Sequence, residues 1–113
     1  MDIVFSTKKL QNVCNSGKEL QRKYGAQKAR KIQQRLYELA AAKTLADVSH
    51  LPPPRCHALT GDRAGQFAVT TVQQHRIIFE PANDPIPHLE DGSINIAAVT
   101  AVRILDVDID YHG

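Results

Sequence analysis

Long apolar runs are missing from this sequence. No stretch approaches the roughly 18 apolar residues that a membrane span requires, and residues 1–9 lack the order of charge, apolar run and cleavage site that defines a signal peptide. Repeats and low-complexity segments are also absent. We therefore expect a cytoplasmic protein without a membrane span, folded as one domain over residues 1–113.

Cysteine is scarce. Cys14 and Cys56 do not make a disulfide framework, and a reducing compartment would keep both as thiols. The five histidines and two cysteines show no spacing of a metal site, so we expect no metal and no cofactor. Cys56 precedes His57, but neighbours in an extended strand point to opposite faces, which disfavours a cysteine nucleophile activated by that imidazole.

Charge is divided unevenly along the chain. Residues 1–43 hold ten Lys and Arg against three Asp and Glu, a net charge of +7, whereas residues 44–113 hold four against nine, a net charge of −5. Such a division is typical of a basic face for nucleic acid. A solvated helical surface is the alternative interpretation, because many soluble helices are rich in Lys and Arg.

The first half of the chain has helical patterns. Ser6 or Thr7 can cap a helix through Leu10 and Val13, and residues 16–19 have the form of a capping box for a helix that ends at Gly25. From residue 26 onward, apolar residues recur at steps of three and four, which predicts a long amphipathic helix. A brief helical turn is expected over residues 44–48.

Three cations of the long helix also recur at steps of three and four. Lys28, Lys31 and Arg35 are predicted to form a basic ridge on its outer side. The run of prolines over residues 52–54 then forbids helix and predicts an extended connection to the segment around His57.

The apolar period changes to two in the second half. Phe67 and Val69 share one face of a predicted strand, and Ile77 and Phe79 share one face of the next, which indicates an antiparallel hairpin whose connection is a longer loop or a bulge. Residues 81–95 are expected to form an exposed excursion. A last strand over residues 97–109 starts apolar on both faces, which suits an interior position in the sheet.

The end of that strand is acidic. If the backbone stays extended, Asp106, Asp108 and Asp110 share a face, and His112 joins them. A second polar segment runs from residue 55 to residue 67 and is followed by Arg76. Two histidines, His57 and His112, and two arginines, Arg63 and Arg76, suit cleavage of a phosphate ester.

These segments resemble the toxins of type II toxin–antitoxin modules in the RelE/ParE superfamily, and HigB-type plasmid maintenance killer proteins most of all. The resemblance is carried by Arg35-Leu36, by the His-x-Leu-x-Gly-Asp-Arg-x-Gly-x-aromatic run at residues 57–67, by Arg-Ile-x-Phe at residues 76–79, and by Asp-Tyr-His at residues 110–112. One difference is Thr60, where HigB-type toxins often have a lysine. The resemblance implies an α+β fold, with a small, mainly antiparallel mixed sheet packed against an N-terminal helical hairpin.

The resemblance also implies a function and partners. Such toxins enter the ribosomal A site and cut mRNA, and each is held by an antitoxin, here expected to be a HigA-like protein with a helix-turn-helix domain. The functional histidine of the family falls on His57, its phosphate-binding arginines on Arg63 and Arg76, and its terminal residues on Asp110, Tyr111 and His112. Lys28, Lys31 and Arg35 would contact ribosomal RNA, and we expect the free protein to be a monomer.

RNA cleavage without an external nucleophile requires a base for the ribose 2′-hydroxyl, charge stabilisation at phosphorus and an acid for the 5′-oxygen. Histidine suits both proton transfers at neutral pH, and arginine binds two phosphate oxygens while it stays protonated. His57 and His112 are the acid–base candidates, with their order undecided, and Asp110 either orients one histidine, acts as the base or is an electrostatic neighbour. A ParE-like gyrase inhibitor and an attenuated toxin relative remain the alternative functions.

Overall fold

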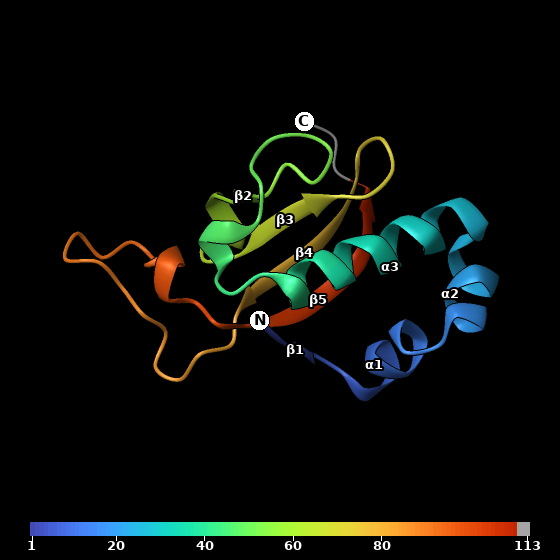
Figure 1. Cartoon of the computed structure of the whole chain (residues 1–113), viewed down its shortest axis with the longest axis horizontal. Coiled ribbons are helices and arrows are strands. Elements are labelled where there is room, and N and C mark those ends of the chain that lie inside the picture. Colours follow the sequence, from blue (N-terminus) through green and yellow to red (C-terminus); the bar gives the residue numbers. More distant parts are fainter. Residues whose placement is uncertain (111–113) are drawn as a thin grey trace.

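The computed structural model of the protein describes residues 1–110 (Figure 1). Five strands form one sheet in the order β1-β5-β4-β3-β2, in which β1 runs parallel to β5 and the other neighbours are antiparallel. The strands are β1 (Asp2–Phe5), β2 (His57–Ala58), β3 (Phe67–Thr70), β4 (His75–Pro81) and β5 (Ala101–Asp110), and the α-helices are α1 (Lys8–Cys14), α2 (Gly17–Tyr24) and α3 (Ala26–Ala41). The predicted α+β fold, with a mixed sheet and N-terminal helices, is confirmed.

The helices cover one face of the sheet, where the main core lies. Ile32 and Leu39 of α3 and Leu20 of α2 pack there against Ile77 and Phe79 of β4, and all five side chains are at most 1% exposed. A smaller cluster on the other face consists of Leu59, Ala68 and Ile78, with Leu105 and Ile109 beside it, and no residue of α1, α2 or α3 belongs to it. The three α-helices therefore do not contribute to the packing on this second face.

The helix boundaries follow the predicted caps. Thr7 Oγ accepts a hydrogen bond from the Leu10 amide at 3.1 Å, and Ser16 Oγ accepts one from the Glu19 amide at 3.2 Å. Between α2 and α3, Gly25 has φ 87° and ψ 163°, a backbone conformation that is essentially restricted to glycine. The chain reverses at this residue, so that α2 and α3 form the helical hairpin.

The connection from the helices to β2 differs from the prediction in one place. The expected helical turn is present as a 3₁₀ helix, η1 (Leu45–Asp47). The proline run is not extended, because residues 52–54 form a turn in which the Arg55 amide donates to the Leu51 carbonyl at 3.0 Å. Three prolines cannot donate backbone hydrogen bonds themselves, but the carbonyl and amide on either side of them can close the turn.

The long excursion before β5 extends away from the body of the protein (Figure 1). Apart from the 3₁₀ helix η3 (Ile96–Ala98) and one isolated bridge between His88 and Ile94, it carries no regular structure over residues 82–100. Strand β5 consequently begins at Ala101, four residues later than predicted, and lies between β1 and β4 as its apolar start indicates. None of the helices in residues 1–110 is both long and apolar enough to span a bilayer.

The register between β4 and β5 is irregular. Ile78 and Phe79 pair with Asp106 and Ile104, which leaves one extra residue in β5, and a second shift lies between Arg76 and Ile78. As a result, Val107 is buried in the helix-side core while the next residue, Asp108, also reaches Lys28 of α3. The regular alternation predicted for this strand is therefore wrong, because bulges place consecutive side chains on one face.

Candidate functional site

A cavity of about 470 Å³ lies beside the edge strand β2. Its lining comes from β2 and the residues on either side of it, and from the start of β4 with the loop before it. The lining residues are Arg55, His57, Ala58, Leu59, Thr60, Gln74 and Arg76. The structure thus brings together His57 and Arg76, two predicted site residues that are 19 positions apart in the sequence.

His57 is held in one orientation by the backbone. It lies on β2, opposite Ala68 of β3, and its Nδ1 is 2.8 Å from the carbonyl oxygen of Arg55. Because a carbonyl oxygen only accepts hydrogen bonds, Nδ1 must carry the proton in this contact. The neutral imidazole therefore keeps an unprotonated Nε2, which is the form that a general base requires.

Arg76 is anchored by the hairpin loop between β3 and β4. One terminal guanidinium nitrogen donates to the Gln73 carbonyl at 3.0 Å and to the His75 carbonyl at 3.1 Å. The loop itself is closed by hydrogen bonds between Thr71 and His75 and between His75 and Val72, and Gln73 has a left-handed φ of 52°. The loop is longer than two residues, as predicted, and its carbonyls fix the arginine beside the cavity.

Arg63 lies outside this cavity. It ends the 3₁₀ helix η2 (Gly61–Arg63), and its guanidinium donates to Gln66 Oε1 at 3.0 Å. Thr60, which precedes this helix, does line the cavity. Of the two predicted site residues in the segment 57–67, His57 therefore lines the cavity and Arg63 does not.

Asp110 is the last described residue of the site. It is exposed at the end of β5, opposite His75 of β4. Near it, His75 Nδ1 and Asp108 Oδ1 are 3.0 Å apart, which makes an ion pair when the imidazole is protonated. Tyr111 and His112 lie outside the described residues.

The predicted position of Arg35 is wrong. Its side chain is 2% exposed, with Nε donating to the Thr70 carbonyl at 2.7 Å and a terminal nitrogen 3.1 Å from the Glu38 carboxylate. Arg35 follows buried Ile32 by three residues and precedes buried Leu39 by four, so it belongs to the buried stripe of α3. The charge is tolerated there because both the carbonyl and the carboxylate face it.

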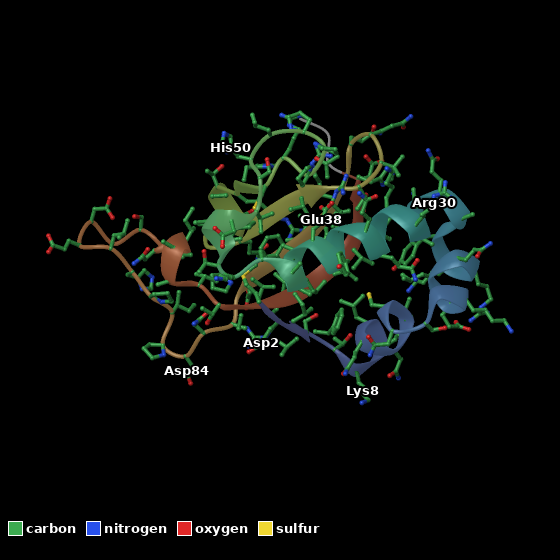
Figure 2. The ribbon with its side chains drawn as sticks, in the orientation of Figure 1. Asp2, Lys8, Arg30, Glu38, His50 and Asp84 are labelled. Carbon is green, nitrogen blue, oxygen red and sulfur yellow. The ribbon has the colours of Figure 1, made fainter. Side chains whose placement is uncertain are left out.

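The other two cations of the predicted ridge are also not fully exposed. Lys28 donates to Asp108 Oδ2 at 3.3 Å and so ties α3 to β5, and Lys31 is half-buried. Arg30, by contrast, is exposed on α3 (Figure 2). A continuous outer ridge of Lys28, Lys31 and Arg35 is therefore not present on α3.

The sequence analysis missed Arg55. It lines the same cavity as His57 and Arg76, and it adopts a left-handed backbone with φ 47°. Its closeness in sequence to the predicted site residue His57 was the available signal. Arg55 stands two positions before His57.

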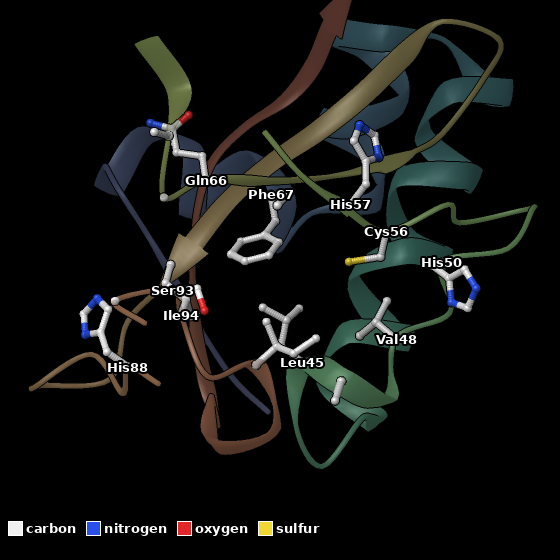
Figure 3. Close-up of a pocket in the computed structure, with 16 residues that line it drawn as sticks. Leu45, Val48, His50, Cys56, His57, Gln66, Phe67, His88, Ser93 and Ile94 are labelled. Atoms are coloured by element: carbon white, nitrogen blue, oxygen red, sulfur yellow. The ribbon is translucent and has the colours of Figure 1, made fainter. Parts of the chain in front are cut away.

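A larger cavity of about 680 Å³ lies on the other side of β2 (Figure 3). Leu45, Val48, Cys56 and Phe67 give it an apolar wall, whereas the ring of His57 points away from it. It shares the backbone of β2 with the smaller cavity but contains no lysine or arginine. Of the two cavities, the smaller one is the one that described arginines line, as the phosphate chemistry predicted from the sequence requires.

The two cysteines lie in apolar surroundings. Burial raises the pKa of Cys56 to about 11, and burial together with the charge of Asp106 raises the pKa of Cys14 to about 11. A thiol with such a pKa is not a nucleophile at neutral pH. Within residues 1–110, no three His, Cys, Asp or Glu side chains are grouped in a way that would hold a metal ion.

Comparison with known proteins identifies the fold. No protein-family profile matches the sequence. No curated protein matches it either. Among solved structures, the chain is similar to a YoeB/ParE toxin from Agrobacterium tumefaciens, with a TM-score of 0.59, 13% sequence identity, and coverage of 98% of this chain and 100% of that chain. The two proteins therefore share the fold over essentially their whole length.

Proposed function

We propose that this protein is the toxin of a type II toxin–antitoxin system and that it inhibits translation by cutting mRNA. The fold supports the toxin assignment, because it is shared with a protein described as a YoeB/ParE toxin. The observation that carries the nuclease assignment is the cavity in which an exposed imidazole with its Nδ1 bonded to the Arg55 carbonyl lies with Arg76. An arginine that can bind a phosphate and a histidine that can accept a proton, lining one cavity, suit phosphodiester cleavage by acid–base catalysis.

In the proposed reaction, His57 Nε2 removes the proton of a ribose 2′-hydroxyl. The 2′-oxygen attacks the adjacent phosphorus, the bond to the 5′-oxygen of the next nucleotide breaks, and an acid returns a proton to that oxygen. The products are a 2′,3′-cyclic phosphate and a 5′-hydroxyl. Because side chains carry out both proton transfers, the proposed reaction uses no metal and no cofactor. Arg76 stabilises the charge that builds up on the non-bridging oxygens.

The remaining residues of the proposal come from the end of the chain. His112 is the proposed acid, Tyr111 the proposed stacking partner of a nucleotide, and Asp110 a group that orients one of the histidines. Either histidine can exchange roles with the other, but the hydrogen bond at His57 Nδ1 favours His57 as the base. Arg63 would bind RNA beyond the cavity, since its side chain lies outside it.

We also propose the partners. The toxin would be HigB-like and cytoplasmic, and it would act in the ribosomal A site. Lys28 and Lys31 would lie near ribosomal RNA. Arg35 is left out of this contact because its side chain is buried. A HigA-like antitoxin with a helix-turn-helix domain would inhibit it. The free toxin is expected to be a monomer.

The test is primer extension on mRNA from a reconstituted translating system, with the wild-type chain and the variants His57→Ala and Arg76→Ala. Removal of a general base lowers the rate by roughly 10²- to 10⁴-fold, so cuts within translated codons should disappear in both variants. Arg103→Gln is the matched control, because Arg103 is paired with Glu80 at the other end of β4 and lines a different cavity. Its cutting pattern should equal that of the wild type.

Two results would contradict the proposal. Cutting that persists in His57→Ala and Arg76→Ala would place the chemistry elsewhere in the protein. Growth arrest by the wild-type chain without any mRNA cuts would exclude the nuclease mechanism, and a supercoiling assay with DNA gyrase would then test the ParE-like alternative.

A further inference from the structure

Arg55 lines the cavity, and hydrogen bonds hold its backbone on both sides. Its amide donates to the Leu51 carbonyl at 3.0 Å, and the carbonyl of the preceding residue, Pro54, accepts from the Thr70 amide of β3 at 2.7 Å. The following residue, Cys56, is buried and donates its amide to the Ser49 carbonyl at 2.9 Å. Backbone bonds on both sides therefore maintain the left-handed conformation of Arg55, in which its own carbonyl reaches His57 Nδ1.

The Arg55 guanidinium, in contrast, is uncommitted. It is exposed, and within residues 1–110 it makes no hydrogen bond and no ion pair. Other arginines of the chain are engaged: Arg22 with Glu19, Arg35 with Glu38, and Arg103 with Glu80. A cation that lines a cavity without an internal anion is suited to an external one.

The cavity is large enough for more than one phosphate group. Its volume of about 470 Å³ falls within the roughly 300–1,000 Å³ that is typical of ligand sites. Thr60 contributes a hydroxyl but no charge, so within residues 1–110 the cations that line the cavity are Arg55 and Arg76. They come from two different segments, the turn before β2 and the start of β4, and His57 belongs to the same lining.

We propose that Arg55 is a second phosphate-binding residue of this site. This inference rests on the proposed nuclease function: with the scissile phosphate at Arg76 and His57, the Arg55 guanidinium binds the neighbouring phosphate of single-stranded RNA. One residue thereby has two roles, because its carbonyl holds the Nδ1 proton of His57 while its side chain fixes the strand. The ligand class is a run of at least two consecutive phosphates.

The experiment measures binding rather than cleavage. A short 2′-O-methyl RNA, which cannot be cut because it has no free 2′-hydroxyl, is titrated onto the full chain at several salt concentrations. Arg55→Gln should weaken binding about tenfold and lower the slope of log K against log[salt] by about 0.7, as expected for one lost phosphate contact to a single strand. Arg55→Lys should recover the slope, because it keeps the charge.

Two further variants make the outcome decisive. Arg55→Gly keeps the left-handed backbone and the carbonyl that holds His57, so it should weaken RNA binding as Arg55→Gln does. If both variants bind the RNA like the wild type, Arg55 does not bind a phosphate. Arg103→Gln removes an equal charge outside the cavity and should change the slope less. If the wild-type chain cuts mRNA and Arg55→Gln binds the RNA as tightly as the wild type, this inference alone is overturned. If the wild-type chain neither binds the RNA nor cuts mRNA, the proposed function is overturned as well.

Discussion

Arg35 carries a full charge into the interface between α3 and β3. Its guanidinium bonds to the Thr70 carbonyl, and this bond supports β3 just before the loop that anchors Arg76. Removal of the guanidinium would leave the part-buried Thr70 carbonyl without this donor, while Glu38 is still 36% exposed and can be solvated. We therefore expect Arg35 to act on stability rather than on RNA binding.

We expect Arg35→Met to lower the free energy of unfolding by about 1–3 kcal/mol, the usual effect of losing a hydrogen bond that involves a charged group. Urea unfolding followed by circular dichroism measures this difference. Arg30→Gln is the matched control on the same helix, and because Arg30 is exposed its effect should stay within about 0.5 kcal/mol. Equal unfolding curves for Arg35→Met and the wild type would contradict a structural role for Arg35.

At the scale of elements, the helical hairpin depends on the reversal at Gly25. The φ of 87° and ψ of 163° are open to glycine because it has no Cβ, and the residue ends α2 by donating its amide to the Gln21 carbonyl at 2.9 Å. A Cβ at this position would meet no atom within 4 Å, so any cost of a substitution is backbone strain alone.

Gly25→Ala should accordingly lower the free energy of unfolding by about 1–3 kcal/mol. Gly17→Ala, at the other end of α2, is the control: Gly17 does not have a positive φ, and its added Cβ would meet only the end of the flexible Gln33 side chain, at 2.9 Å. The midpoint of urea unfolding should fall in Gly25→Ala and change little in Gly17→Ala. A larger loss in Gly17→Ala would refute the strain argument.

At the scale of the whole molecule, the half-buried thiol of Cys14 and the buried thiol of Cys56 make folding sensitive to alkaline pH. The pKa of Cys14 and of Cys56 rises from 9.0 to about 11 in the folded protein. Folding thus favours the neutral thiol. The contribution of this preference to the free energy of unfolding is complete below pH 9 and is lost as the pH rises toward 11. In the unfolded chain the thiols ionise first, which stabilises the unfolded state over this range.

The midpoint of urea unfolding should therefore decrease between about pH 9 and pH 11 in the presence of reductant. The double variant Cys14→Ala, Cys56→Ala should show a smaller decrease over the same range, even if it is less stable at pH 7. Burial also raises the pKa of Tyr24, so part of the decrease should remain in the double variant. An identical pH dependence in both proteins would mean that the thiols do not contribute.

Local patterns in the sequence already determined the helices and the hairpin. Thr7 and Ser16 cap their helices through bonds that span three residues, and alternation sends Val69 and Ile77 to one side of the sheet. Such features depend on neighbours within a few positions, and no distant part of the chain has to be known. The candidate pair His57 and Arg76 was also accessible from residue types and motif spacing.

Only the tertiary structure decided which polar side chains face a partner and which face the site. Arg35 is buried because Thr70, 35 positions away, offers a carbonyl, and Lys28 is half-buried because bulges in β5 turn Asp108 toward α3. Arg55 joins the site because a closed turn and a bond to β3 give it a left-handed backbone. These outcomes depend on the energies of contacts between distant segments, which the local pattern around each residue does not contain.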